Sequence, residues 1–507
     1  MENLSRSDHR PEGQIVERSR RDKSPATATA TAPSNVLGWG RSLVNLALAV
    51  ACFNLAYAST RLPVMALFIV GYAGFLVQLT NQPTVRRAFY FGLAAGFGCA
   101  AGQAFFFSKI FGVAAVVLWI VFGFWIGLFT AISCGCIRRW GKPAGAWLVP
   151  IIWTGTEYFR SELYYLRFSW LNIGYAFSNV PHTPFNELGM YGVGFVVVFV
   201  MSAICFLPFG RNLWVAGLCI GLAALTIFAQ RLLLPTRGKV DSSLTIAGVQ
   251  MEVPPEKVIP EILNQALAKN PKAGIFVMSE YTLEEGGIPD ALKDWCRKHS
   301  RFLVFGGKDV VTNDVYYDTA FVIGTNGDIV FKQAKCVPVQ FMKDGLPATR
   351  QEIWDSPWGK IGICICYDLS YTRVTDALVR DGAQMLIVPS MDVEEWGRHE
   401  HELHFRVAPV RAAENGIPIF RVASSGISQA VSSRGTIIAR TSIPGRGDIL
   451  SAQMQLPAYG SIPIDRVIAP FCVIVTGAIT AMLLFLNWQG GRPNQKGVVS
   501  HMSHKMV

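Results

Sequence analysis

Residues 359–371 carry the sequence GKIGICICYDLSY, an apolar run that ends in polar residues. Two cysteines, Cys364 and Cys366, lie two positions apart within it. A short, isoleucine-rich apolar run predicts a buried β-strand. Cysteine is among the residues most often buried, so both thiols could be ordinary strand residues, but a thiol at a strand end could also be a nucleophile. The neighbouring sequence bears on this choice.

Short strand-like runs of this kind recur over residues 243–460. Helical stretches separate several of them, for example at 256–269 and 399–415. The sequence FVIGTNGDIVFK at 321–332 predicts a hairpin, because Asn-Gly lies between two strand-like halves. Alternation of strands and helices over such a length is typical of layered α/β domains. We therefore predict one α/β domain at 243–460.

Three reactive side chains stand at the ends of such runs. Glu280 follows GIFVMS, Lys335 follows DIVFKQA, and Cys366 follows GKIGICI. If they converge at one sheet edge, they suffice for acyl transfer, with a Cys366 thiolate as nucleophile and Glu280 as general base. The Lys335 ammonium and the backbone N–H of Tyr367 would hold the oxyanion. Spacing alone leaves other interpretations open, since Glu280 could begin a helix and Lys335 could be a surface lysine.

The rest of the chain is apolar enough to predict a membrane protein. Of its 507 residues, 51% are hydrophobic and 16% are charged, against roughly 25% charged residues in soluble domains. A membrane-spanning helix needs about 20 mainly apolar residues, and eight stretches meet this need, seven of them in a transmembrane domain at 37–236. The predicted helices are 37–57, 61–80, 88–107, 110–135, 143–158, 191–208, 213–234 and 463–488.

Basic loop residues predict the orientation of these helices. They all fall on one side if the N-terminus is cytoplasmic, as the positive-inside rule requires. The α/β domain then lies outside the cytoplasm, while residues 1–36, a disordered tail, and residues 489–507 lie inside. The net charge of +11 is explained by cytoplasmic segments, and no motif indicates nucleic-acid binding. The loop residues are Arg86, Arg87, Arg138, Arg139, Lys142 and Arg211.

Several segments together carry a family resemblance. VMSEYTL, KCVP and CICYDLSY resemble the three catalytic segments of the nitrilase superfamily, which uses Glu, Lys and Cys in that order. TEYFRSELYYLRFSWLNIGYAFSN resembles the stretch of apolipoprotein N-acyltransferases that reads E-x-x-R and then G-F-P-W-L-x-x-G-Y. RVAPVRAAENGIPIFRVASSG is similar to a further motif of that family. Eight membrane helices, with an α-β-β-α nitrilase-like domain before the last, are also its layout.

The resemblance decides between the two cysteines. The family places its nucleophile in an I-C-Y-E segment, which ICYD at 365–368 matches. It therefore implies that Cys366 is the nucleophile and that Asp368 takes the place of the nearby Glu. Cys364 is then a buried strand residue.

The lysine segment departs from the family pattern K-x-H-L-V-P-F-G-E. Here it reads FKQAKCVPVQFMKDG, and an alignment on Val-Pro without a gap puts Gln333 at the lysine position. Lys335 is the preferred candidate, because the hairpin could be shorter here, and Lys332 is the alternative. The family glutamate of F-G-E is missing, and Asp344 is the nearest acid.

The resemblance implies a two-step acyl transfer at the outer face of a bacterial cytoplasmic (inner) membrane. Cys366 would attack an ester of a phospholipid, such as the sn-1 ester of phosphatidylethanolamine. The α-amine of a diacylglyceryl-modified lipoprotein cysteine would then accept the acyl chain. We expect no cofactor and no metal, because no Cys/His cluster has zinc spacing.

Two other functions stay open at this point. A membrane-tethered amidase for a small amide would use the same three residues, and a non-enzymatic receptor would not need them.

Family members carry mobile lids, and MDVEEWGRHEHELHF at 391–405 is the candidate here. Its Trp396 could instead be an interfacial anchor.

Overall fold

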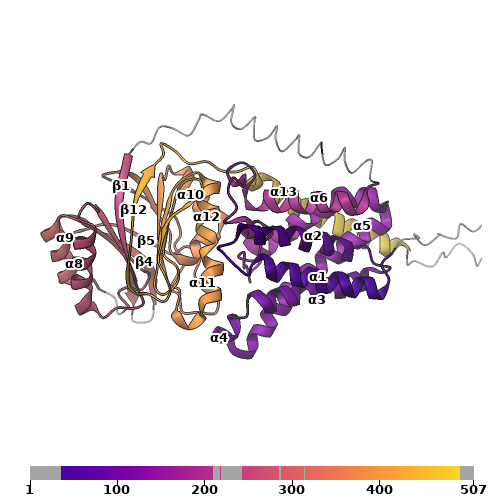
Figure 1. Ribbon diagram of the computed structural model, residues 1–507, viewed down its shortest axis with the longest axis horizontal. Coiled ribbons are helices and arrows are strands. Elements are labelled where there is room, and N and C mark those ends of the chain that lie inside the picture. The colour runs from indigo at the N-terminus through magenta and orange to yellow at the C-terminus, as the bar shows by residue number, and fades with distance from the viewer. Residues whose placement is uncertain (1–35, 209–216, 218–241, 285–286, 313–314, 491–507) are drawn as a thin grey trace, which may run out of the picture. The chain divides into compact units, whose positions relative to one another are not determined.

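The computed structural model describes residues 36–208, 217, 242–284, 287–312 and 315–490. From Leu37 onward, the described residues belong to one compact unit. This unit contains apolar helices and a layered α/β domain (Figure 1). Apart from residue 217, the predicted helix at 213–234 lies outside the described residues, so the count of eight membrane helices stays a prediction.

Long apolar helices precede and follow the α/β domain. Among the described residues, four helical stretches are long and apolar enough to cross a membrane, namely Trp39–Ala56, Phe107–Leu163, Phe185–Phe206 and Asp465–Gln489. The protein is therefore a membrane protein. Its apolar helices are α1 (Trp39–Ala56), α2 (Leu67–Leu79), α3 (Val85–Gln103), α4 (Phe107–Phe111), α5 (Ala115–Tyr158), α6 (Phe185–Phe206) and α13 (Asp465–Gly490).

The predicted helices at 110–135 and 143–158 correspond largely to the two halves of α5, which are separated at Gly141, where the backbone is not helical. Gly141 has a φ of 83°, a conformation that glycine adopts readily because it has no Cβ. Helix α3 packs closely on α5, since a Cβ added to Gly96 would lie 2.8 Å from the Cα of Gly123. Small residues allow such close approach of membrane helices, and both helices line the cavity described below.

Two β-sheets form the centre of the α/β domain. Within the described residues, each sheet has six strands, in the orders β12-β1-β2-β3-β4-β5 and β11-β10-β9-β8-β7-β6. The first comprises β1 (Ser242–Met251), β2 (Ile275–Met278), β3 (Phe302–Thr312), β4 (Val315–Ile323), β5 (Ile329–Ala334) and β12 (Arg446–Leu456). The second comprises β6 (Ile353–Ser356), β7 (Gly359–Ile363), β8 (Met385–Ser390), β9 (Ile419–Ala423), β10 (Gln429–Val431) and β11 (Ile437–Arg440).

Helices cover both outer faces of the paired sheets, which gives the expected α-β-β-α sandwich (Figure 1). Helices α8 (Ile259–Lys269) and α9 (Asp290–His299) pack on the first sheet, and α10 (Thr372–Arg380) and α12 (Val407–Asn415) pack on the second. Apolar side chains of both sheets share one buried core between them, for example Val277 and Ile387. The predicted hairpin at 321–332 forms as β4 and β5, which pair antiparallel.

Candidate active site

Strand ends bring Glu280, Lys335 and Cys366 together. Glu280 follows β2 and Lys335 follows β5, both in the first sheet, whereas Cys366 follows β7 in the second. The Nζ of Lys335 lies 2.7 Å from Oε1 of Glu280, and both side chains are only 1% exposed. The Cys366 thiol is within hydrogen-bonding reach of the Glu280 carboxylate and of the Met391 carbonyl oxygen, which is 3.6 Å away. One buried site therefore holds a thiol, a carboxyl group and an amine.

The two candidate lysines lie in different surroundings. Lys332 reaches the surface, where its Nζ lies 2.6 Å from Asp309 and 57% of the side chain is exposed. The Nζ of Lys335 lies 2.7 Å from Asp344 and 3.4 Å from Asp318, in addition to its contact with the predicted base. The structure thus brings Lys335 into the site and leaves Lys332 outside it.

Burial and neighbouring charges set the protonation of this group. Burial alone raises the pKa of Glu280, but the Lys335 ammonium and several hydrogen bonds hold it below its ordinary value. Burial alone lowers the pKa of Lys335, but the surrounding carboxylates raise it well above normal. Burial and the Glu280 charge raise the pKa values of the Cys366 thiol and of Asp318. At neutral pH the site therefore combines an ionised Glu280 and Lys335 with a neutral thiol.

The turn after β7 presents the nucleophile candidate. Cys366 has a φ of 47°, a conformation that is costly for residues with a Cβ and that clusters at functional sites. The Asp368 carboxylate accepts hydrogen bonds from the backbone N–H groups of Cys336 and Val337, at 3.1 and 2.7 Å. Burial raises the pKa of Asp368 to about 6. Because Cys336 directly follows Lys335, Asp368 joins the nucleophile turn to the lysine segment.

An apolar cavity opens beside the thiol. Cys366, Tyr367 and Trp396 line it on the side of the α/β domain, and helices α3, α4 and α5 line it on the other. The Tyr367 hydroxyl donates a hydrogen bond of 2.9 Å to the carbonyl oxygen of Arg167, in a connecting segment that also lines the cavity. The apolar lining includes Ala100, Ala104, Phe107, Ile110, Trp119, Phe122, Trp125 and Phe168.

Family models match both parts of the chain. Residues 49–203 match the apolipoprotein N-acyltransferase N-terminal domain, and residues 255–464 match carbon-nitrogen hydrolase. The chain belongs to the apolipoprotein N-acyltransferase family. Its α/β domain places this family member in the nitrilase superfamily.

Curated relatives extend the match over most of the chain. An apolipoprotein N-acyltransferase of Geobacter metallireducens is 22% identical over 425 residues, which cover 72% of this chain and 81% of the relative. One from Allorhizobium ampelinum is 24% identical over 88% of this chain and 95% of its own length. A deaminated glutathione amidase of Dictyostelium discoideum is 30% identical, over 29% of this chain and 55% of its own length.

Two further residues predicted from the family resemblance can now be located. Asp344 accepts hydrogen bonds from the Tyr281 hydroxyl at 3.0 Å and from the Val339 N–H at 2.7 Å, in addition to its contact with Lys335. Trp396 is partly exposed and lines the cavity. The segment predicted as a lid forms a short 3-10 turn and helix α11 (Arg398–Phe405), most of whose residues are buried.

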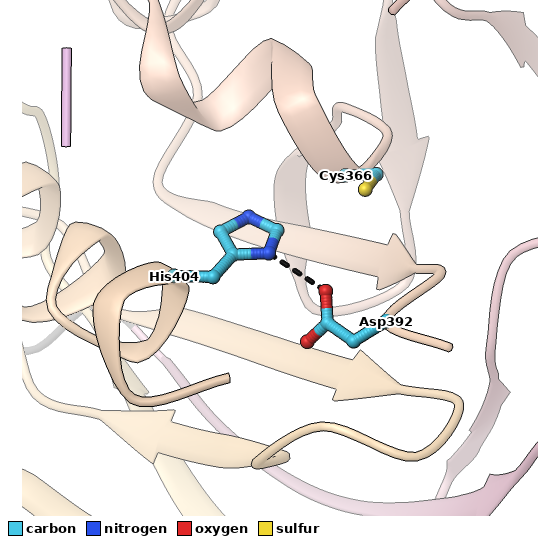
Figure 2. A group of neighbouring side chains, drawn as sticks. All are labelled: Cys366, Asp392 and His404. Carbon is cyan, nitrogen blue, oxygen red and sulfur yellow. Dashed lines mark hydrogen bonds and ion pairs between the residues drawn. The ribbon is translucent and has the colours of Figure 1, made fainter. Parts of the chain in front are cut away.

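A buried group that the sequence did not reveal lies on another side of the thiol. Ligand-type atoms of Cys366, Asp392 and His404 lie within 4.8 Å of one another. Figure 2 shows that His404 directs Nδ1 to Asp392, with a separation of 2.7 Å. Arg421 Nη2 lies 2.6 Å from the second Asp392 oxygen. These four residues lie after β7, after β8, on α11 and on β9, and the sequence offered only the histidine-rich segment 391–405 as a signal.

Charge balance within the site argues against a resident metal ion. A second acidic group, Glu280, Asp318 and Asp344, also has ligand-type atoms within 4.8 Å of one another. Lys335 already contacts all three of these acids, and Arg421 contacts Asp392 in the other group. Each set of carboxyl groups therefore has a protein cation as its counter-charge.

Proposed function

We propose that this chain is an N-acyltransferase that moves a fatty acyl chain from a phospholipid to the α-amine of the diacylglyceryl-cysteine of lipoproteins. One observation carries the proposal: the Cys366 site opens into an apolar cavity lined by helices that are apolar enough to lie in a membrane. Such a cavity suits an acyl chain, and a small polar amide would not need it. The family membership supports the same reaction.

In the first half-reaction, the Cys366 thiol loses its proton to Glu280 and its sulfur attacks the ester carbonyl of the phospholipid. Lys335 Nζ, held among three acids, stabilises the oxyanion of the tetrahedral intermediate, together with the backbone N–H of Tyr367. The carbon–oxygen ester bond then breaks. Glu280 returns the proton to the glycerol oxygen, which leaves a thioester on Cys366 and a lysophospholipid.

In the second half-reaction, the α-amine of the lipoprotein attacks the thioester carbonyl. A carbon–nitrogen bond forms, the carbon–sulfur bond breaks, and Glu280 carries a proton from nitrogen to sulfur. Both substrates are lipids, and this is the physical reason for joining a nitrilase-like site to membrane helices.

The proposed location is the bacterial cytoplasmic membrane, with the domain at 243–460 on the extracytoplasmic side. Exposed apolar side chains on the helices support contact with lipid, for example Val113 at 91%, Val467 at 73% and Ile474 at 70% exposed. Basic residues between the apolar stretches, for example Arg86 and Arg87, support this orientation of the domain.

Mass spectrometry of the purified full-length protein tests the proposal. Incubation with phospholipid alone should add one acyl mass to the peptide that contains Cys366, and hydroxylamine should remove it. Addition of a diacylglyceryl-cysteine peptide should discharge the protein and yield the N-acyl peptide.

The similarity to the Dictyostelium amidase favours a second candidate, hydrolysis of a small amide. Absence of an acyl adduct, together with ammonia release from small amides, would select that candidate instead.

A further inference from the structure

His404 has the surroundings of a base rather than of a structural residue alone. The ring is buried at 2% exposure and lines the cavity beside Cys366. It stacks on the indole of Trp170, with ring centroids 4.5 Å apart and an interplanar angle of 16°. Its Nε2 is buried and has no hydrogen-bond partner among the described residues. A buried polar atom without a partner is costly, so a group bound during the reaction would be a natural partner.

The neighbours of the ring fix its tautomer. Asp392 stays ionised because, although burial raises its pKa, Arg421 and His404 lower it well below normal. His404 Nδ1 lies 2.7 Å from Oδ1 of this carboxylate and 2.8 Å from Arg421 Nη2. An ionised oxygen at that distance needs a donor, so we assign the proton to Nδ1 and the lone pair to Nε2. Burial and Arg421 lower the pKa of His404, which keeps the ring neutral. The arrangement therefore offers a free base at Nε2.

Charged and titratable groups reach this ring from several elements. Asp392 follows β8, Arg421 lies on β9, and Cys366 begins the turn after β7. Glu400, on the same helix, lies 3.9 Å from His404 Nδ1. Burial and Asp392 raise the pKa of Glu400 well above normal, so it is neutral. Glu280 acts on the ring through its charge. The Asp392 carboxylate and the Arg421 guanidinium are thus the charged groups nearest to the His404 ring, and their opposite charges nearly cancel.

The proposed second half-reaction has one proton more than Glu280 can carry. An α-amine has a pKa of about 7.7–8.0, so near neutral pH it is largely an ammonium. Its reaction with the thioester gives an amide, the free thiol and one released proton. Glu280 carries the proton that passes from nitrogen to sulfur. The other proton must leave the ammonium before nitrogen can attack, and it needs a different acceptor.

We propose that His404 Nε2 takes this extra proton from the acceptor ammonium and passes it to solvent, with Asp392 orienting the ring. His404 is then a second catalytic base that serves only the amine half-reaction, while Glu280 serves both. The inference rests on the proposed function, and it explains why two bases lie beside one thiol.

Single-turnover measurements on His404→Gln separate the two steps. Acyl-enzyme formation from phospholipid should stay within about twofold of wild type, which also shows that the variant is folded. Transfer from the isolated acyl-enzyme to a diacylglyceryl-cysteine peptide should slow by about 100-fold at pH 6.5, a typical contribution of a general base. The deficit should shrink to a few-fold at pH 9, because the amine is then already neutral. His399→Gln, on the same helix but outside the cavity lining, is the matched control and should behave as wild type.

The remaining outcomes are also decisive. An equal deficit at both pH values would overturn the proposal, and so would loss of acyl-enzyme formation in a folded variant, since His404 would then serve the thiol. If the variant does not fold, the wild-type acyl-enzyme provides the test: its transfer rate should change little between pH 6 and 7, whereas a tenfold fall per pH unit would show that no base removes the proton. Failure of the wild type to form or discharge an acyl-enzyme would contradict the proposed function instead.

Discussion

Lys335 is the residue on which the charge balance of the site depends. Its ammonium lies within 3.4 Å of three acids, at 2.7 Å from both Glu280 and Asp344. Without it, two or more carboxyl groups would share a buried space, and at least one of them would have to be protonated. A protonated Glu280 could not accept the proton of the thiol.

Substitution of the two candidate lysines should therefore have very different effects. Lys335→Ala should abolish acyl transfer and destabilise the protein by about 3–5 kcal/mol, because it leaves buried carboxylates without their cation. Lys332→Ala should keep most activity and change stability by about 1 kcal/mol or less, since its ion pair is exposed. Transfer assays and thermal inactivation in detergent measure both effects. An inactive Lys332→Ala beside an active Lys335→Ala would contradict the assignment.

The two cysteines of the opening stretch differ in the same way. Cys364 is fully buried and lies outside the lining of the cavity, whereas Cys366 lines it. Cys366→Ser should form no acyl-enzyme, because a hydroxyl is far less readily ionised than a thiol. Cys364→Ser should retain the adduct and lose about 1–3 kcal/mol of stability from a buried hydroxyl. An adduct that persists in Cys366→Ser and disappears in Cys364→Ser would reverse the two roles.

At the scale of elements, helix α12 links the membrane helices to the nucleophile turn. Glu414 accepts a hydrogen bond of 2.6 Å from the Met190 N–H of α6, and it pairs with Arg466 of α13 at 3.1 Å. Its other partner, Arg411, donates to the carbonyl oxygen of Ser370, which ends the turn that begins at Cys366. Helices α6, α12 and α13 and the turn at 366–370 thus meet around the buried Glu414–Arg411 pair.

Glu414→Gln should lower stability most at neutral pH. Burial raises the pKa of Glu414, but Arg411 and Arg466 lower it to about 2, against about 4.3 for an unfolded glutamate. A depressed pKa stabilises the folded state above the unfolded value, and this contribution is lost as pH falls from about 4.3 toward 2. We expect a loss of about 3–5 kcal/mol at pH 7, seen as a lower inactivation temperature. The gap to wild type should narrow below pH 4, and a gap independent of pH would contradict this role of the charge.

At the scale of the whole molecule, the membrane helices and the α/β domain form one site. Trp170, which precedes the domain by many residues in the sequence, donates a hydrogen bond of 2.8 Å to Ser370 of the nucleophile turn. The cavity takes its lining from both parts. The proposed lipid substrates would need a cavity lined by both parts.

The proposed orientation is open to a direct topology measurement. A reporter fused after residue 300 should behave as extracytoplasmic, and one fused at the C-terminus should behave as cytoplasmic, because basic loops favour the cytoplasmic side. An insertion of the same reporter between α2 and α3, at residues 80–84, is the internal control and should be cytoplasmic. The reverse pattern would remove the basis for a lipoprotein acceptor.

The sequence by itself determined the layered α/β domain, the apolar helices and the three residues at strand ends, because hydrophobic period and strand punctuation are local properties. It also predicted the hairpin that ends near Lys335. It also predicted separate helices at 110–135 and 143–158, but not that the break between them falls at Gly141, where the backbone is not helical. The choice of Lys335 over Lys332 at the site, the acid cluster around it and the Asp392–His404 pair were decided only by the tertiary structure. Their members come from separate strands and helices, and burial and mutual charge, which set their chemistry, exist only once those elements have packed together.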